Sequence, residues 1–253
     1  MSAWRAYAWW LGLLLLAPIA LPLALRTRRN TLRLPPAAGL SNGVAGADLA
    51  GEPLRLLVLG ESTVVGVGVD ELHAALVGQL AEALAARCGR PVAWRACGEN
   101  GITAAQAYAR LLPQVLGQPF DLALLVFGVN DTTHLTSLSR WQAALGGMAE
   151  ALAARGARVA FSSVPPLQHF SALPWLLRKL LGWRASLMDR HLRRVCLEEG
   201  VEYQRLALEF SADYLARDGY HPSALGYRVW GEGLALGVSA GNGPAGSATG
   251  ARV

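Results

Sequence analysis

Short apolar runs and amphipathic stretches alternate along the chain from residue 54 onward. The runs Leu54–Leu59 and Phe120–Phe127 are apolar at nearly every position, which is typical of strands buried on both faces. A glycine follows each of these runs and marks the turn into a loop. Three further segments complete a prediction of five strands: Leu54–Leu59, Pro91–Ala96, Phe120–Phe127, Ala157–Ser162 and Val201–Leu206.

The segments between the predicted strands carry apolar residues at helical spacing. The sequence predicts five helices there and after the last strand: Glu71–Arg87, Thr103–Leu116, Ser139–Ala154, Ala185–Glu199 and Ala224–Leu236. Strands that alternate with helices form right-handed crossover units, which give a parallel sheet covered on both faces. We therefore expect one α/β domain over residues 54–237, built as a three-layer α/β/α sandwich with a five-stranded parallel sheet.

The N-terminus has a different pattern. Ala6–Leu25 contains no charged residue, and about 20 apolar residues are what a helix needs to cross a bilayer. Arg5 precedes this segment and arginines at 26, 28, 29 and 33 follow it, while tyrosine and tryptophan at 7, 9 and 10 fit an interfacial aromatic belt. A retained transmembrane anchor over residues 1–33 is our prediction; a cleaved signal peptide and a buried core helix are the alternatives.

Composition and charge agree with this division. Hydrophobic residues make up 53% of the chain and charged residues 16%, and the net charge is +5. The first 50 residues hold five arginines and one aspartate, a net charge of +4, so the basic character belongs to the anchor and argues against a nucleic-acid-binding surface. The heavier arginine cluster follows the helix, which favours a bacterial inner-membrane protein with its domain on the cytoplasmic side.

Three other segments stand apart from the predicted domain pattern. Residues 34–53 are rich in Pro, Gly and Ala and are interpreted as a linker, and residues 238–253 as a disordered tail of low complexity. Val164–Trp183 is longer and more apolar than a simple connection. It is either a helix packed on the core or an apolar wall near an active site, and Trp175 within it is a candidate pocket residue.

Candidate chemistry lies just after the predicted strands, where ligands bind in an open parallel sheet. Ser62 follows the first strand, and alone it would be an ordinary turn serine. The glycines around it form neither a P-loop nor a dinucleotide-binding motif. A nucleophilic serine needs a base and a group that orients this base, and Asp218 and His221 can supply both from one loop. Backbone N–H groups of Ser62 and Gly101 and the side-chain amide of Asn130 are candidates for an oxyanion hole.

In their order along the chain, these residues resemble the signature blocks of the SGNH hydrolases, also called GDSL esterases and lipases. The blocks are Gly60–Ser62, Gly101, Gly128–Asp131 and Asp218–His221. The resemblance extends over about residues 54–237 and implies a flavodoxin-like fold and ester hydrolysis through a serine acyl-enzyme, with no metal and no organic cofactor.

Carried onto this chain, the family pattern makes Ser62 the nucleophile, His221 the general base and then acid, and Asp218 the residue that orients it. Ser62, Gly101 and Asn130 would form the oxyanion hole. The chain departs from the pattern at Glu61, where the family usually has aspartate. We expect altered packing of the loop there, with the chemistry retained.

The expected substrate is a small-molecule or lipid ester, since the anchor and the apolar segment favour an acyl chain. Deacetylation of a carbohydrate or cell-envelope polymer is the alternative within the enzyme class, and a non-catalytic membrane-tethered binding domain is the alternative of another class. His134 is a further candidate pocket residue because it lies four positions after Asn130, together with Glu61 and Trp175.

Overall fold

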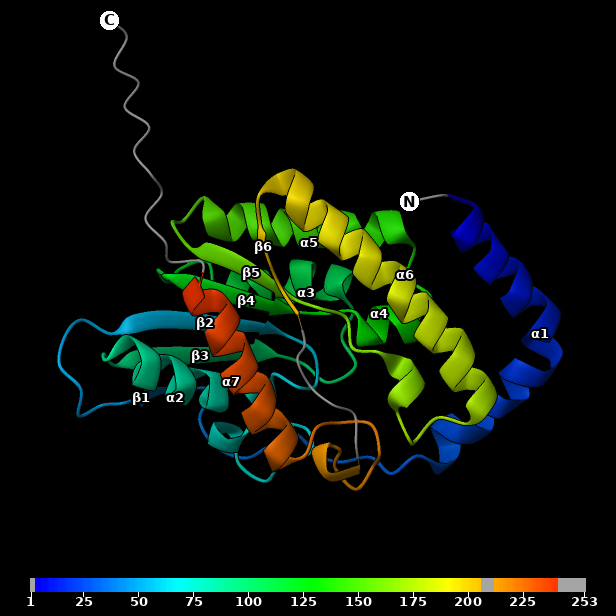
Figure 1. The fold of residues 1–253 in the computed structure, drawn as a ribbon, viewed down its shortest axis with the longest axis horizontal. Helices are drawn as coiled ribbons and strands as arrows, with labels where there is room; N and C mark the ends of the chain where they lie inside the picture. The colour runs from blue at the N-terminus through cyan, green and yellow to red at the C-terminus, as the bar shows by residue number, and fades with distance from the viewer. Residues whose placement is uncertain (1–2, 206–211, 241–253) are drawn as a thin grey trace, which may run out of the picture.

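A computed structural model describes residues 3–205 and 212–240 and contains a six-stranded sheet in the order β1-β3-β2-β4-β5-β6 (Figure 1). Strands β2 to β6 are parallel, and β1 is an antiparallel edge strand. The strands are β1 (Asn42–Ala45), β2 (Leu54–Gly60), β3 (Val92–Gly98), β4 (Leu122–Val126), β5 (Arg158–Ser162) and β6 (Glu202–Gln204). The predicted parallel sheet is confirmed, with one edge strand more than the pattern indicated.

Helices cover both faces of the sheet, which completes the predicted α/β/α sandwich (Figure 1). On one face lie α2 (Leu76–Cys88) and α7 (Ala224–Ala240), and on the other α3 (Ala104–Arg110), α5 (Leu138–Ala153) and α6 (Trp175–Glu199). Residues 56–60 of strand β2 are buried between them, and successive side chains alternate between the two cores. Leu57 and Leu59 pack toward α3, α5 and α6, and Leu56 and Val58 toward α2 and α7.

Several short elements connect the strands and long helices. They are the helix α4 (Val129–Thr133) and the 3₁₀ turns η1 (Leu72–Ala74), η2 (Leu112–Gln114), η3 (Leu167–His169) and η4 (Ala212–Tyr214). The predicted helices Glu71–Arg87 and Thr103–Leu116 include η1 and η2. The sequence pattern did not predict α4, η3 and η4, because a single turn shows no periodicity.

Strand β1 lies within residues 34–53, which we expected to be a linker. It pairs with the edge of β3, with Val44 opposite Ala93 and Ala45 opposite Val92. Four residues rich in glycine and small side chains are too few for a recognisable alternation, and the strand exists because it satisfies the open edge of β3.

Two helices extend beyond the predicted boundaries. Helix α6 begins at Trp175 instead of Ala185, so half of the apolar segment Val164–Trp183 is the first part of one long helix. Helix α7 reaches Ala240 and includes the first three residues of the predicted tail. The rest of that tail, and Leu206 of the fifth predicted strand, lie outside the described residues.

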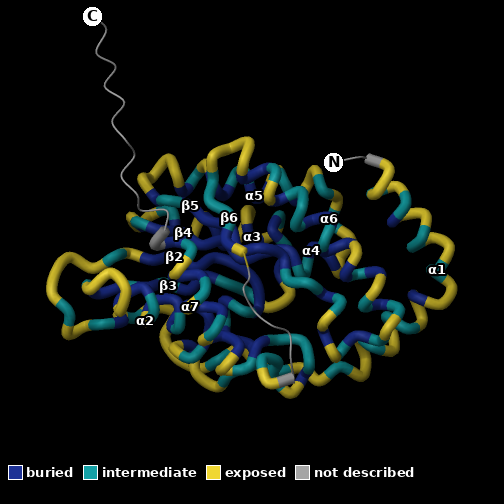
Figure 2. Tube along the Cα trace, in the orientation of Figure 1, coloured by how far each residue is buried: buried dark blue, intermediate teal, exposed yellow. Residues whose placement is uncertain are grey.

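Helix α1 (Ala3–Asn30) lies alongside α6 at the edge of the molecule, away from the sheet (Figure 1). Residues 4–30 are long and apolar enough to cross a membrane, with a mean hydropathy of 2.0, a property shared by signal sequences and some core helices. Most of α1 is exposed or half-buried (Figure 2). Trp9 and Ala20 are the exceptions, at 1% and 5% exposed, and the indole N–H of Trp9 donates to the Leu180 carbonyl over 2.8 Å.

The strand order places the ends of three strands at one point. The chain passes from β2 to β3 on one side of β2, and then to β4 on its other side. The carboxyl ends of these strands carry Ser62, Gly101 and the segment Gly128–Asp131. A reversal of strand order leaves a crevice between the diverging connections, and this is where ligands bind in such sheets.

Candidate active site

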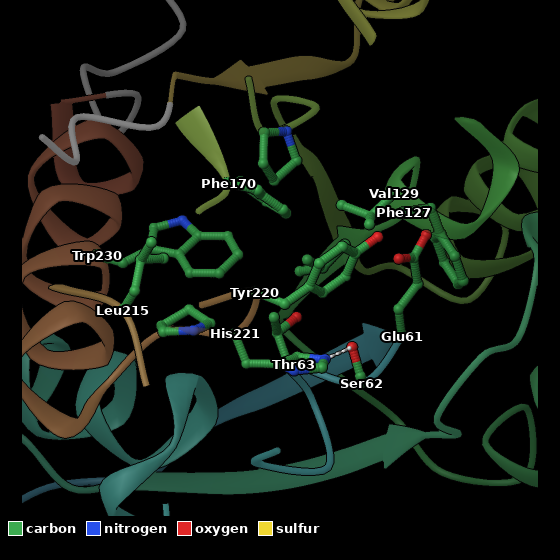
Figure 3. Close-up of a pocket in the computed structure, with 13 residues that line it drawn as sticks. Glu61, Ser62, Thr63, Phe127, Val129, Phe170, Leu215, Tyr220, His221 and Trp230 are labelled. Carbon is green, nitrogen blue, oxygen red and sulfur yellow. Dashed lines mark hydrogen bonds between the residues drawn. The ribbon is translucent and has the colours of Figure 1, made fainter. Parts of the chain in front are cut away.

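Ser62, His221 and Asp218 form one hydrogen-bonded chain. The Ser62 hydroxyl lies 2.9 Å from Nε2 of His221, and Nδ1 of the same imidazole lies 2.6 Å from a carboxylate oxygen of Asp218 (Figure 3 shows the Ser62–His221 contact). Ser62 is 8% exposed, so its hydroxyl sits in a largely enclosed position. The order nucleophile, base and orienting acid is what proton transfer from a serine hydroxyl requires.

The loop that carries Asp218 and His221 is organised by the Asp218 carboxylate. Its second oxygen accepts the backbone N–H groups of Tyr220 and His221, both over 3.0 Å. Burial alone would raise the pKa of Asp218, but the hydrogen bonds from His221 and from these N–H groups outweigh it and hold the pKa below its ordinary value. The carboxylate is therefore charged at neutral pH and fixes the orientation of the imidazole.

The Ser62 loop and the His221 loop are held against each other. Gly68, after the serine, has φ of +110°, and a Cβ there would lie 2.3 Å from the Pro222 carbonyl oxygen. Only glycine permits both the backbone conformation and this approach. The buried Tyr227 of α7 adds a second tie, because its hydroxyl donates to the Val67 carbonyl over 2.7 Å.

The candidate oxyanion residues lie on two neighbouring loops. The side-chain N–H₂ of Asn130 donates one hydrogen bond of 2.9 Å to the Ile102 carbonyl, which links the loop after β4 to the loop after β3. Gly101 has φ of +83°, a left-handed conformation that favours glycine. Asp131 is fully buried and accepts the backbone N–H of Ala104 over 2.9 Å, so it joins the same two loops.

Glu61, the departure from the family pattern, is buried directly beside Ser62. One of its carboxylate oxygens accepts the backbone N–H of Gly128 over 2.5 Å, and the other accepts that of Asn130 over 3.2 Å. Burial raises the pKa of Glu61 to about 8 even though these N–H groups lower it. The longer side chain thus supports the loop after β4 from the strand that carries Ser62.

An apolar cavity opens beside Ser62 and His221 (Figure 3). Figure 3 shows that Phe170, Trp230 and Leu215 lie on one side of Tyr220, and Phe127, Val129 and Glu61 on its other side. Thr63, Val126, Pro165 and Pro222 complete the lining. A cavity with these neighbours is suited to an apolar group attached to the carbon that Ser62 would attack.

The structure brings together most of the residues that the sequence singled out, but not all of them. Of the three candidate pocket residues, Glu61 lines the cavity. His134 is exposed and hydrogen-bonds the carbonyl of Asn130 over 2.8 Å, and Trp175 is 66% exposed at the start of α6; neither lines the cavity.

Both interpretations of the segment Val164–Trp183 hold for different parts of it. Pro165 and Phe170 line the cavity, whereas Leu177 and Leu180 pack into the core. Sequence reasoning missed Phe170, Leu215 and Trp230, which come from separate elements. The sequence could have identified Tyr220 as a residue near the site, since it stands between Asp218 and His221. Within residues 3–205 and 212–240, no three His, Cys, Asp or Glu side chains are grouped so that they could hold a metal ion.

Comparison with known proteins extends the resemblance. The model of the GDSL-like lipase/acylhydrolase family matches residues 58–229. The chain is 28% identical over 187 residues to a GDSL-like esterase from Mycobacterium tuberculosis, and the match covers 70% of this chain and 59% of the relative.

Two solved structures share the fold. A lipase/acylhydrolase from Enterococcus faecalis has a TM-score of 0.58 at 20% identity, with 74% of this chain and 96% of that chain covered. An inhibitor-bound aryl esterase from M. smegmatis has a TM-score of 0.59 at 19% identity, with 74% and 99% covered. Because the family model spans most of the described domain, the chain belongs to the GDSL-like lipase/acylhydrolase family, within the SGNH hydrolases.

Proposed function

We propose that this protein is a serine esterase that cleaves carboxylic esters through an acyl-enzyme on Ser62. The observation that carries the proposal is the hydrogen-bonded chain from Asp218 through His221 to the Ser62 hydroxyl, with lengths of 2.6 and 2.9 Å. These contacts join residues from opposite ends of the domain. A binding domain that had lost catalysis would have no need to retain them.

In the first half of the reaction, the Ser62 oxygen attacks the ester carbonyl carbon and its proton passes to Nε2 of His221. The carbonyl π electrons move to the oxygen, which becomes an oxyanion, and N–H groups of Ser62, Gly101 and Asn130 would stabilise this charge. The C–O bond to the alcohol then breaks, and the imidazolium returns its proton to the departing alkoxide. The products of this half are the free alcohol and an ester between the acyl group and Ser62.

In the second half, water replaces the alcohol. His221 takes a proton from the water while the water oxygen attacks the acyl carbon. His221 then gives this proton to the Ser62 oxygen as the bond between that oxygen and the acyl carbon breaks. The carboxylic acid leaves and the serine is regenerated. Asp218 remains charged throughout and stabilises the imidazolium in both halves.

We assign the acyl side of the substrate to the apolar cavity beside Ser62. Phe170, Tyr220 and Trp230 offer it aromatic surface, which favours an apolar acyl group over a sugar. Acetyl esters of a carbohydrate or cell-envelope polymer would leave most of this surface unused and are the second candidate. A series of p-nitrophenyl esters from acetate to decanoate distinguishes them, since an apolar acyl subsite predicts kcat/KM that rises beyond acetate.

We further propose that α1 is retained and holds the catalytic domain, residues 54–237, at a membrane. Large apolar side chains on its exposed face, such as Leu14, Leu15 and Ile19, are between 63% and 72% exposed. Trp9 on its other face is buried against α6, and a cleaved leader would remove this packed side chain. The arginines after the helix favour the cytoplasmic side of a bacterial inner membrane. Sedimentation of the full chain with membranes after alkaline washing, and N-terminal sequencing, test retention.

Covalent labelling tests the mechanism. A fluorophosphonate should label the wild-type chain in a 1:1 ratio, and Ser62→Ala should abolish both labelling and hydrolysis of p-nitrophenyl esters. Folding is monitored by circular dichroism. A folded wild-type chain that is neither labelled nor active would show that the domain binds and does not catalyse.

A further inference from the structure

A buried arginine on α6 contacts both helix α1 and the turn that follows helix α4. Arg184, in the middle of α6, is 4% exposed, and its guanidinium carbon lies 4.7 Å from the centre of the Trp9 ring and 5.4 Å from that of Trp10. Its Nη2 donates to the Thr136 carbonyl over 2.5 Å. Burial lowers the pKa of Arg184 to about 10, although the nearby Asp131 raises it. The group is therefore still a cation at neutral pH.

The segment that Arg184 contacts is part of the loop system after β4. The Thr136 N–H donates to the Asp131 carbonyl over 3.0 Å, so the segment closes back on the residue next to Asn130. Between them, Leu135 has φ of +55°, the one left-handed residue other than glycine in the described chain. Such a conformation costs about 1 kcal/mol or more for a leucine and persists only where neighbouring contacts enforce it.

The charge of Arg184 acts on Asp131, which is 0% exposed. Burial raises the pKa of Asp131 above its ordinary value, and the Ala104 N–H, Thr136, His134 and Arg184 oppose this rise without cancelling it. One side-chain oxygen of Asp131 accepts the Ala104 N–H and so connects the segments that carry Gly101 and Asn130. Arg184 is one of the groups that favour the charged form of this buried side chain, so loss of Arg184 would also reach this connection.

We propose that Arg184 is a positioning residue. Held by Trp9 and Trp10 of α1, it fixes residues 130–136, which comprise most of helix α4 and the turn after it, and so keeps the oxyanion hole in place. The proposal rests on the esterase function proposed above. It gives α1 a role in catalysis as well as in attachment, because the helix completes the surroundings of a cation that supports the active site.

Loss of Arg184 should have a specific kinetic effect, because an oxyanion hole stabilises the transition state. Donors that shift by a fraction of an ångström stabilise the developing charge less but bind the ester ground state almost as before. Loss of Arg184 should therefore lower kcat and leave KM nearly unchanged. A general loss of folded protein would instead lower the number of active sites, which titration with a fluorophosphonate counts separately.

The experiment compares four full-length variants in detergent with p-nitrophenyl acetate. Arg184→Met removes the charge but keeps an apolar chain, and we expect kcat per labelled site to fall about tenfold to hundredfold with KM within twofold of wild type. Arg184→Lys retains the charge and should recover part of this loss. Trp9→Leu should lower kcat about threefold to tenfold. Tyr7→Leu, an aromatic-to-leucine change at a 71% exposed position of the same helix, is the matched control and should be unchanged.

Three outcomes would overturn the inference. Wild-type kcat per labelled site in both Arg184→Met and Trp9→Leu would show that the contact does not support the site. Equal losses in Trp9→Leu and Tyr7→Leu would assign the effect to the helix surface. A wild-type chain without esterase activity and without labelling at Ser62 would overturn the proposed function, and this inference with it. If the wild type is active and Arg184→Met is unaffected, only the inference is overturned.

Discussion

Two buried carboxyl groups flank Ser62, and their pKa values are shifted in opposite directions. Asp218 accepts hydrogen bonds from His221 and two backbone N–H groups, and its pKa is lowered. Glu61 accepts two backbone N–H groups on the other side of the serine, and its pKa is raised to about 8. Both residues are less than 10% exposed, so burial alone does not explain the difference.

The difference lies in the partner of each carboxylate. Asp218 faces an imidazole that would become a cation in the proposed reaction, where the charged form of the acid stabilises it. Glu61 has only N–H dipoles within hydrogen-bonding distance and also experiences the negative charge of Asp131. A carboxylate next to a partner that can carry positive charge serves catalysis, whereas one held by backbone N–H groups serves the shape of a loop.

The largest expected effect comes from Asp218→Asn. Asparagine keeps the size of the side chain but removes the charge that orients and stabilises the imidazolium, so we expect kcat/KM to fall about 10³-fold to 10⁴-fold. Steady-state hydrolysis of p-nitrophenyl acetate measures this. A decrease of less than tenfold would show that Asp218 has only a structural role.

The pH dependence of folding distinguishes the two acids next. Because the folded pKa of Glu61 lies above its unfolded value of 4.5, the folded state binds its proton more tightly. The stabilisation is fully present below pH 4.5 and is lost as the pH rises toward about 8, by about 5 kcal/mol in total. For Asp218 the sign is reversed, since its lowered pKa gives stabilisation that is lost as the pH falls below its unfolded value.

Urea unfolding of wild type and Glu61→Gln at pH 5, 6.5 and 8 isolates the contribution of Glu61. Glutamine does not titrate, so the difference in unfolding free energy between the two chains should shift by about 2 to 4 kcal/mol in favour of the variant as the pH rises. Asp218→Asn measured in parallel should show no such shift over this interval. A constant wild-type to Glu61→Gln difference would show that Glu61 is charged in the folded state over this whole pH range.

The smallest expected effect is that of Glu61→Asp, which restores the usual family residue. The carboxylate retreats by about 1.5 Å and cannot hold both the Gly128 and the Asn130 N–H groups without a shift of the loop. We expect a loss of about 1 to 2 kcal/mol in stability and a decrease in kcat/KM of less than tenfold.

Glu82→Asp, an exposed change of the same chemistry on α2, is the control for Glu61→Asp. Thermal unfolding and steady-state kinetics compare the two variants. A hundredfold loss of kcat/KM in Glu61→Asp alone would mean that Glu61 takes part in the reaction and does not only support the shape of the loop.

The sequence predicted the parallel sheet and singled out Ser62, Asp218 and His221 because both predictions depend on local patterns. Apolar runs such as Leu54–Leu59 are legible wherever a strand is buried on both faces, and Asp218 and His221 stand three residues apart in one loop. Strand β1 and the start of α6 at Trp175 were not predicted, since the first is stabilised by the edge of β3 and the second by its packing on the core.

The sequence by itself determined the family, the succession of five parallel strands along the chain and the candidate residues that follow these strands, because hydrophobic periodicity and short motifs act over a few residues. Only the tertiary structure decided what surrounds Ser62. The cavity is formed by Phe170, Leu215 and Trp230 from three distant segments, and the buried charge of Arg184 is met by Trp9 from the opposite end of the chain. Burial and charge compensation arise from contacts between remote segments, and no local pattern records which of them will come together.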